Sequence, residues 1–218
     1  MRQRITLLAP FVLIPLAAIV FRQTAQRMGP AIGTLAGFLF YQLFGCILFP
    51  CAMLGGRNVL QLFQTRQPFF QRRNTMLVIM LALTVAGAIP LFLGYVRVQT
   101  AAVFLIGIPL TVFNGVCEEL LWRGVFVRMF PKRYLLSVLY PALLFPCWHL
   151  APQCIDPELT LRQALPLVAM AFPLGLVYGH VAYRTQSIRW ISVAHGISGI
   201  LAFGIPLSTS LAAVVGIR

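Results

Sequence analysis

Apolar residues run along the chain in long stretches that short polar segments separate. A window of about 19 residues, the length of helix that crosses a bilayer, resolves them into eight segments. They span residues 5–21, 30–54, 75–95, 103–130, 134–150, 163–183, 189–204 and 206–217. The pattern predicts an all-α, polytopic membrane protein with about eight transmembrane helices, in which residues 1–218 form a single membrane domain. The last segment is short, so we expect it to be tilted or re-entrant.

Composition supports this interpretation and excludes a soluble globular domain. Hydrophobic residues make up 60% of the chain and charged residues only 10%. Arg2 and Arg4 precede the first segment, as in a secretory signal, but no small-residue cleavage site follows and Arg22 ends the segment abruptly. We therefore expect an uncleaved first helix. Residues 55–74 form the longest loop, which we expect to pack as a basic surface helix.

The positions of the basic residues predict the orientation in the membrane. With a cytoplasmic N-terminus, twelve of the seventeen Lys and Arg residues fall on the inner side, four on the outer side, and Arg123 lies within the membrane. Asp156 and Glu158 then share an outer loop. We expect both termini to be cytoplasmic and the bilayer to be a partner. The net charge of +13 mainly reflects this topology, and the scattered basic residues form no nucleic-acid-binding module.

Glu118 and Glu119 account for half of the four acidic residues and lie side by side at the end of an apolar stretch, in the run CEELLWRG. An ionisable group inside a bilayer costs roughly 2.5–3.5 kcal/mol, so such a group indicates a functional site. Arg123 follows Glu119 by four residues, on the same helical face, where the two can form an ion pair. Glu118 is rotated by about 100° and has Asn114 one turn earlier on its own face. We therefore expect Glu118 to face a polar cavity and Glu119 to support it.

His149 is expected to lie at the depth of Glu118. The turn near residues 131–133 separates their helices, and both residues lie roughly 20–24 Å from it. His195 lies about 9 Å into a helix that starts on the same side, so a kink or an oblique helix has to bring it to the others. One carboxylate and two imidazoles suit the activation of water for hydrolysis. A zinc ion held by Glu118, His149 and His195 could activate the water, or Glu118 could deprotonate it directly.

Other polar residues in the membrane segments have structural interpretations. His180 fits a packed or interfacial histidine, and the three tryptophans, Trp122, Trp148 and Trp190, fit packing or interfacial positions. The cysteines match no zinc or thioredoxin pattern and fit small buried residues, and two of them, Cys117 and Cys147, are close enough in sequence to the acidic pair to be considered as nucleophiles. The cysteines are Cys46, Cys51, Cys117, Cys147 and Cys154.

Two further functions use the same residue types. Glu118 and His149 could pair two helices for stability alone. A transporter or proton relay also carries intramembrane Glu and His, but it should show paired repeats or broken helices in matching halves, and the sequence has neither.

Three motifs together carry a family resemblance. The runs EELLWRG from Glu118, FPCWH ending at His149 and HGISG from His195 resemble, in order and spacing, the signature of the CAAX-processing and bacteriocin-processing intramembrane endopeptidases, the CPBP or Abi family. The resemblance covers roughly residues 103–205, the expected catalytic core.

The resemblance implies peptide-bond hydrolysis in an eight-helix fold, in a cavity open to the cytoplasmic side. It implies Glu118 as the water-activating base, His149 as a ligand or polariser of the water, and His195 as a stabiliser of the oxyanion. Glu119 and Arg123 would hold these groups in place. It leaves both a zinc-dependent and a metal-free mechanism open, and it implies prenylated CAAX-like peptides or leader peptides as substrates.

One position departs from the family pattern. The family has Asn or Asp four residues after the last histidine, where this chain has Gly199. The missing side chain removes a donor whose loss typically costs roughly 10²- to 10³-fold in rate. Ser198 or Asn114 could replace it. The alternative function is therefore a weak or catalytically silent scaffold, regulator or immunity protein of the same fold.

Overall fold

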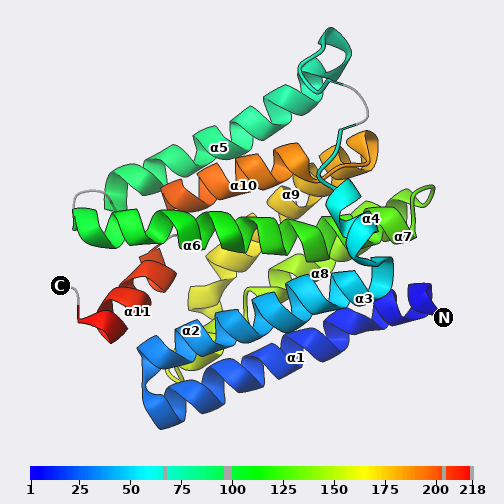
Figure 1. Cartoon of the computed structure of the whole chain (residues 1–218). Helices are drawn as coiled ribbons and strands as arrows, with labels where there is room; N and C mark the ends of the chain where they lie inside the picture. Colours follow the sequence, from blue (N-terminus) through cyan, green and yellow to red (C-terminus); the bar gives the residue numbers. More distant parts are fainter. Residues whose placement is uncertain (66–67, 96–99, 203–204, 217–218) are drawn as a thin grey trace.

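Helices account for nearly all of the secondary structure. The computed structural model describes residues 1–65, 68–95, 100–202 and 205–216, and within these ranges it contains no strand. Figure 1 shows the long helices side by side. In chain order the elements are α1 (Arg2–Met28), α2 (Pro30–Phe40), the π-helix η1 (Tyr41–Leu48), α3 (Phe49–Leu54), α4 (Gly56–Gln61), the 3₁₀-helix η2 (Arg72–Asn74), α5 (Thr75–Tyr95), α6 (Ala101–Glu119), the π-helix η3 (Leu120–Val125), α7 (Phe126–Met129), the π-helix η4 (Leu135–Leu139), α8 (Tyr140–Trp148), the 3₁₀-helix η5 (Pro152–Ile155), α9 (Leu161–Thr185), α10 (Arg189–Ala202) and α11 (Ile205–Val215).

The predicted fold class is confirmed. Among the described residues, six helical runs are long and apolar enough to cross a membrane. The other two predicted segments correspond to α10 and α11, which are shorter, at 14 and 11 residues. Residues 203–204 and 217–218, and with them the C-terminus and parts of the last two predicted segments, lie outside the described residues.

The loop predicted to be a basic surface helix is only partly helical. Within residues 55–74 the helices are α4 and η2. Leu62 and Phe69 are buried, and the carbonyl of Leu62 accepts hydrogen bonds from the Ser187 hydroxyl (2.9 Å) and the Ile188 N–H (2.8 Å). Because the Leu62 carbonyl accepts hydrogen bonds from the turn after α9, it does not accept one from the next turn of a helix, and α4 ends at Gln61.

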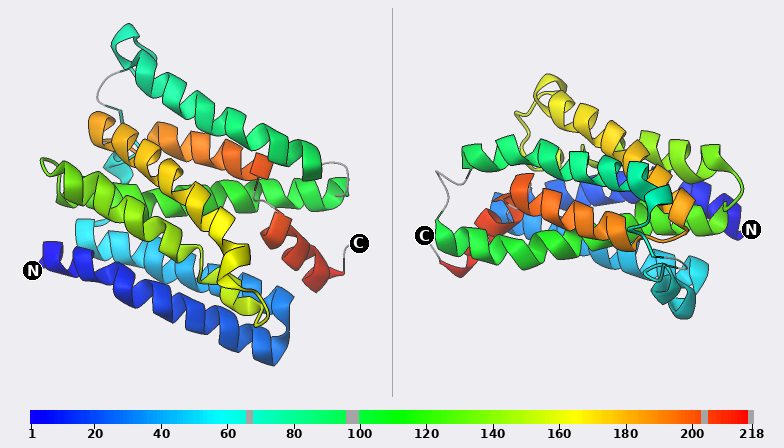
Figure 2. Two further views of the ribbon diagram at one scale, coloured as in Figure 1. Left: turned by 180° about the vertical axis from the view of Figure 1, so that it is seen from behind. Right: turned by 90° about the horizontal axis from the view of Figure 1, so that it is seen from above.

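The two ends of the bundle differ in what they contain. The N-terminus, α4, the turn before α8 and the turn between α9 and α10 lie at one end (Figure 1). The α1–α2 turn, the α8–α9 loop and α11 lie at the other, which Figure 2 shows again from behind. The side chain of Gln3 reaches Met129 O (2.9 Å) and Arg128 reaches Gln61 (2.8 Å), so polar contacts tie the first end together. The last described helix, α11, lies at the end of the bundle opposite the N-terminus.

Helices α1 and α2 form a closely packed hairpin. Gly29 turns the chain between them with a φ of 91°, in the region that glycine adopts without strain. A Cβ added to Gly33 would lie 2.5 Å from the Cβ of Ala25 and 2.6 Å from its Cα. The hairpin thus depends on a backbone approach that only glycine permits at this position.

We expect Gly33→Ala to destabilise the protein by about 1–3 kcal/mol, because the added methyl group meets backbone atoms that cannot rotate away. The matched control is Gly87→Ala in α5, where an added Cβ meets nothing within 4 Å. The control should be neutral or gain about 0.5–1 kcal/mol, since alanine favours a helix over glycine. Thermal unfolding of both variants in detergent measures the difference, and equal stabilities would contradict the close approach of α1 and α2.

Candidate active site

The two adjacent glutamates lie in the last turn of α6 and are both buried, with 3% exposure for Glu118 and 0% for Glu119. The helix continues as the π-helix η3, which carries Arg123. Arg123 donates to Glu119 across one turn, with Nη1 2.8 Å from Oε1. The predicted ion pair is confirmed, and π-helical segments of this kind are frequent at functional sites.

Glu119 also holds His195. The Nδ1 of His195 lies 2.7 Å from Oε1 of Glu119, the oxygen that also accepts from Arg123. Helices α6 and α10 come close enough for this contact because two glycines meet between them, so that a Cβ on Gly115 would lie 3.2 Å from the backbone N of Gly196. Close packing of the two helices therefore brings His195 to the acidic pair.

Aromatic rings cover the charged end of this network. The guanidinium of Arg123 lies 4.2 Å from the centroid of the Phe145 ring and 5.6 Å from that of Tyr178. These are cation–π distances, which favour a cation that is removed from water. The rings keep Arg123 oriented toward Glu119.

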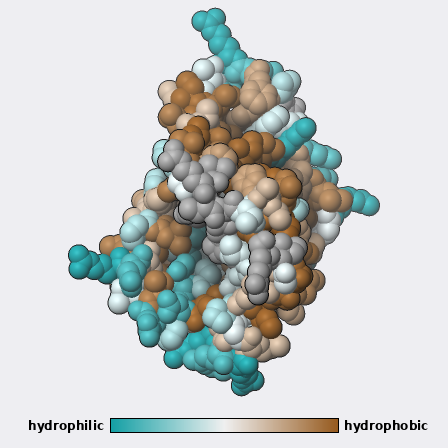
Figure 3. All heavy atoms as spheres, turned by 90° about the vertical axis from the view of Figure 1, so that its left-hand side faces the viewer, coloured by the Kyte–Doolittle hydropathy of each residue, from teal (hydrophilic) through white to brown (hydrophobic). Residues whose placement is uncertain are grey.

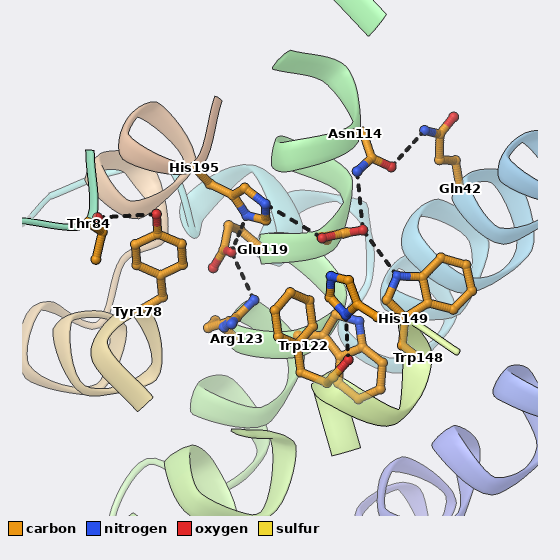
Figure 4. A network of polar contacts seen from close by, with 12 residues as sticks. Gln42, Thr84, Asn114, Glu119, Trp122, Arg123, Trp148, His149, Tyr178 and His195 are labelled. Carbon is orange, nitrogen blue, oxygen red and sulfur yellow. Dashed lines mark hydrogen bonds and ion pairs between the residues drawn. The ribbon is translucent and has the colours of Figure 1, made fainter. Parts of the chain in front are cut away.

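Glu118 is held by two donors on one oxygen. Its Oε1 accepts from the Nδ2 of Asn114 (3.1 Å) and from the indole N–H of Trp148 (3.1 Å). Asn114 in turn accepts from Gln42 (3.0 Å), so a chain of three side chains leads from α6 to η1 (Figure 4). The second oxygen, Oε2, lies 3.6 Å from the Nε2 of His195. One carboxylate oxygen is thus fixed, and the other faces an imidazole at a distance too long for a direct hydrogen bond.

His149 lies near the end of α8 and faces the same cavity as Glu118. Its Nδ1 lies 2.9 Å from the carbonyl of Phe145, which fixes the ring as a donor there and leaves Nε2 as its other nitrogen. The Phe145 ring packs edge-on against it, with centroids 4.6 Å apart. The structure therefore brings His149, Glu118 and His195 to one cavity.

The cavity has a volume of about 380 Å³ and lies between α2, α6, α8, α9 and α10. Most of its wall is apolar, and it extends from Glu118 to Gln153 and Asp156 in the α8–α9 loop. This loop lies at the end of the bundle opposite the N-terminus (Figure 1). Figure 3 views that end, where hydrophilic residues border a hollow in the surface. The cavity therefore extends toward the end of the bundle opposite the N-terminus.

The residues considered as substitutes for the missing family side chain lie in different places. Gly199 lines the cavity. Ser198 lines a separate apolar cavity beside α5 together with Thr84, so it points away from the acidic pair. Asn114 is in place but already donates to Glu118.

The remaining candidates have structural surroundings. The five cysteines are free thiols, and neither Cys117, which is buried, nor Cys147, which is exposed, lines the cavity around Glu118. His180 lies 3.2 Å from the hydroxyl of Tyr134, as a packed or interfacial histidine should. The indole of Trp122 is buried and donates to Tyr41 (2.6 Å).

Two residues of the site were missed by sequence reasoning. The sequence alone indicates a packing role for Trp148, yet its indole N–H donates to Glu118. A buried indole needs a hydrogen-bond acceptor, and the position of Trp148 next to His149 in the sequence indicates that this acceptor could belong to the site. Gln42 is a lone amide within an apolar segment, which was also a signal. Trp148 stacks on Tyr41 with ring centroids 3.4 Å apart, so its N–H is aimed by packing.

The residues proposed to bind zinc fit that role only in part. Both histidines hold their Nδ1 against an oxygen, of Glu119 for His195 and of Phe145 for His149, as zinc-ligating histidines commonly do. Among the residues that the structure describes, however, no group of three or more His, Cys, Asp or Glu side chains is arranged to hold a metal ion.

Comparison with protein families gives one match. The model of the Rce1-like family, described as type II CAAX prenyl endopeptidase, matches residues 98–201. Comparisons with curated proteins and with solved structures gave no match. The matched segment contains the acidic pair and both histidines of the cavity. Over residues 98–201, the chain is similar to the Rce1-like family of type II CAAX prenyl endopeptidases, in agreement with the resemblance of its three motifs.

Proposed function

We propose that the protein is an intramembrane endopeptidase in which Glu118 activates a water molecule for attack on a peptide bond. The observation that carries the proposal is the arrangement of Glu118. Two donors hold its Oε1, while its Oε2 faces His195 across 3.6 Å in a cavity that His149 also lines. A carboxylate fixed on one oxygen and free on the other suits a general base.

The gap between Glu118 and His195 suits a water molecule. Oε2 of Glu118 and Nε2 of His195, 3.6 Å apart, are too far from each other for a direct hydrogen bond, and a water that lies beside the line joining them can bond to both. A water bonded to Oε2 of Glu118 is close to Nε2 of His195, and the carboxylate can accept its proton. The oxygen of that water then attacks the carbonyl carbon of the peptide bond.

His195 suits the stabilisation of the resulting oxyanion. Its Nδ1 faces Glu119 and its Nε2 faces Glu118, so each ring nitrogen points toward a carboxylate to which an N–H can donate. Nε2–H can then donate to the oxyanion. Glu118 returns its proton to the leaving amine, so one water is consumed and a carboxyl and an amino terminus are formed. His149, with Nε2 left as an acceptor, would orient the water.

The substrate is proposed to be an apolar peptide, since most of the cavity wall is apolar. Prenylated CAAX-like peptides and membrane-associated leader peptides both meet this condition. The alternative is a catalytically weak or silent scaffold, regulator or immunity protein. It is favoured by Gly199, because glycine lacks the Asn or Asp side chain that the family has at this position. The gathering of Glu118, His149 and His195 at one cavity supports an enzymatic function. Glu119 and Arg123 hold His195 in place there.

The orientation is proposed from the charges at the two ends. The basic side chains gather at the N-terminal end, which we propose to be cytoplasmic. The cavity then opens on the opposite side, near Asp156, and the earlier expectation of a cytoplasmic active site is replaced. Substrates would reach Glu118 from the non-cytoplasmic side of the membrane.

Glu118→Gln keeps the shape of the side chain and removes the base, so we expect cleavage to fall by roughly 10²- to 10⁴-fold. The assay uses purified protein with prenylated and leader-type peptides, and mass spectrometry identifies the bond. The control is Glu158→Gln, which changes an exposed carboxylate outside the cavity wall. Wild-type cleavage by Glu118→Gln would contradict the proposed base.

Metal analysis of the same purified protein tests the zinc-dependent form, in which Glu118, His149 and His195 would be the ligands. About one zinc per chain, lost together with cleavage on chelation, would support that form. Cleavage by metal-free protein would support direct activation by Glu118.

Trp148→Phe is expected to reduce cleavage by roughly 10- to 100-fold, because Glu118 loses one of its two donors and a hydrogen bond to a charged group is worth about 1.5–3 kcal/mol. Phenylalanine preserves much of the packing on Tyr41. Trp190→Phe is the control, since that ring packs on Phe69 and Phe70 outside the cavity. Equal activities of the two variants would show that the indole N–H does not position the carboxylate.

Thiol labelling tests the orientation. In a background without the native cysteines, a membrane-impermeant reagent should label Glu158→Cys in intact cells and Lys132→Cys only after permeabilisation, because these residues lie in loops at opposite ends of the bundle. The reverse pattern would place the cavity mouth on the cytoplasmic side.

A further inference from the structure

The space beside Gly199 is occupied by a residue of another helix. A Cβ added to Gly199 would lie 2.5 Å from the Cγ2 of Thr111, closer than two carbon atoms can approach without displacement. Thr111 lies on α6, seven residues before Glu118, and both residues line the cavity. Seven residues are about two helical turns, so the two side chains project from the same face of α6.

Thr111 carries a buried hydroxyl group that has no partner. The residue is 6% exposed, and its Oγ1 has no hydrogen-bond partner among the described residues. A threonine inside a helix commonly bonds a backbone carbonyl of the preceding turn, as Thr6 does with Arg2 O (3.0 Å). A buried hydroxyl without a partner destabilises a fold. Its presence at this place therefore calls for a ligand that supplies the missing bond.

We propose that Thr111 replaces the donor that is absent at Gly199, and that its hydroxyl binds the carbonyl oxygen of the peptide bond that is cut. The inference rests on the proposed function. It makes Thr111 a catalytic residue specific to chains that combine glycine at 199 with threonine at 111.

Geometry allows the hydroxyl to take this role. Cγ2 and Oγ1 are both attached to Cβ, and a rotation of about 120° about χ1 brings Oγ1 to the place of the methyl group beside Gly199. Threonine uses two such rotamers in helices. Glycine leaves this place free of any other side chain, so the hydroxyl gains access to the cavity where an asparagine side chain would otherwise lie.

The chemistry matches that of a neutral oxyanion donor. When water attacks the carbonyl carbon, the oxygen becomes negatively charged, and a hydroxyl hydrogen bond strengthens as the charge develops. No bond to Thr111 forms or breaks. Its contribution should therefore appear in kcat more than in KM.

Thr111→Val removes the hydroxyl and keeps the shape of the side chain. We expect kcat to fall by roughly 10- to 10³-fold with little change in KM. We also expect Tm to rise by about 2–4 °C for each kcal/mol gained when the unpartnered hydroxyl is removed. Thr111→Ser, which keeps the hydroxyl, should retain cleavage. The control Thr6→Val removes a buried hydroxyl that has a partner, so it should lower Tm or leave it unchanged and should not affect cleavage.

Gly199→Asn tests the same space from the other helix. Alone, it should lower both Tm and cleavage, because the added side chain meets Thr111. Combined with Thr111→Ala, it should recover cleavage relative to Gly199→Asn, because asparagine then has both the space and a donor.

The outcomes separate the two proposals. Normal cleavage by Thr111→Val, together with loss of cleavage in Glu118→Gln, would overturn the role of Thr111 and leave the proposed function intact. If the wild-type protein cleaves no peptide, the proposed function fails, and the role of Thr111 as a substrate donor is overturned with it. An unchanged or lower Tm of Thr111→Val would also overturn the inference, since it would mean that the hydroxyl is already paired.

Discussion

The buried carboxylate of Glu119 determines how the centre of this protein is built. A charge that is removed from water has to be met by partners inside the fold. Arg123 on η3 and His195 on α10 meet it on the same oxygen, so one residue joins two segments that are far apart in the sequence. Because that contact fixes Nδ1 of His195, it also directs Nε2 toward Glu118. The imidazole that faces Glu118 is thus positioned by the contacts that neutralise Glu119.

The part of the site that lies on one helix could be predicted from the sequence. Helical periodicity alone places Glu118 and Glu119 on different faces and predicts that Glu119 pairs with Arg123 and that Glu118 shares a face with Asn114. The structure contains both hydrogen bonds, from Arg123 to Glu119 and from Asn114 to Glu118. Trp148 could not be assigned in this way, because its role depends on the rotation of α8 against α6. Contacts between helices require crossing positions, which an apolar pattern leaves undetermined.

The same limit explains the difference at the cavity mouth. Counting basic residues assigns the two ends of the bundle to the two sides of the membrane, but it contains no information on the end toward which a cavity widens. That depends on how α2, α6, α8, α9 and α10 pack against one another, since all of them contribute to the wall of the cavity. Likewise, the absence of a side chain at Gly199 was visible in the sequence, whereas the neighbour that fills its place, Thr111, is visible only in the packed helices.

The two hydrogen bonds on Oε1 of Glu118 have a stereochemical consequence. Asn114 and Trp148 both donate to that oxygen, so in the proposed reaction the base acts through Oε2 alone and the water approaches from the side of Oε2. A planar peptide group has two faces, and when its carbonyl oxygen is held by the proposed oxyanion donor His195, the direction of the chain decides which face meets the water. In the proposed reaction, a bound peptide must therefore run through the cavity with a single N-to-C polarity, so a sequence and its reversal would not be equivalent substrates.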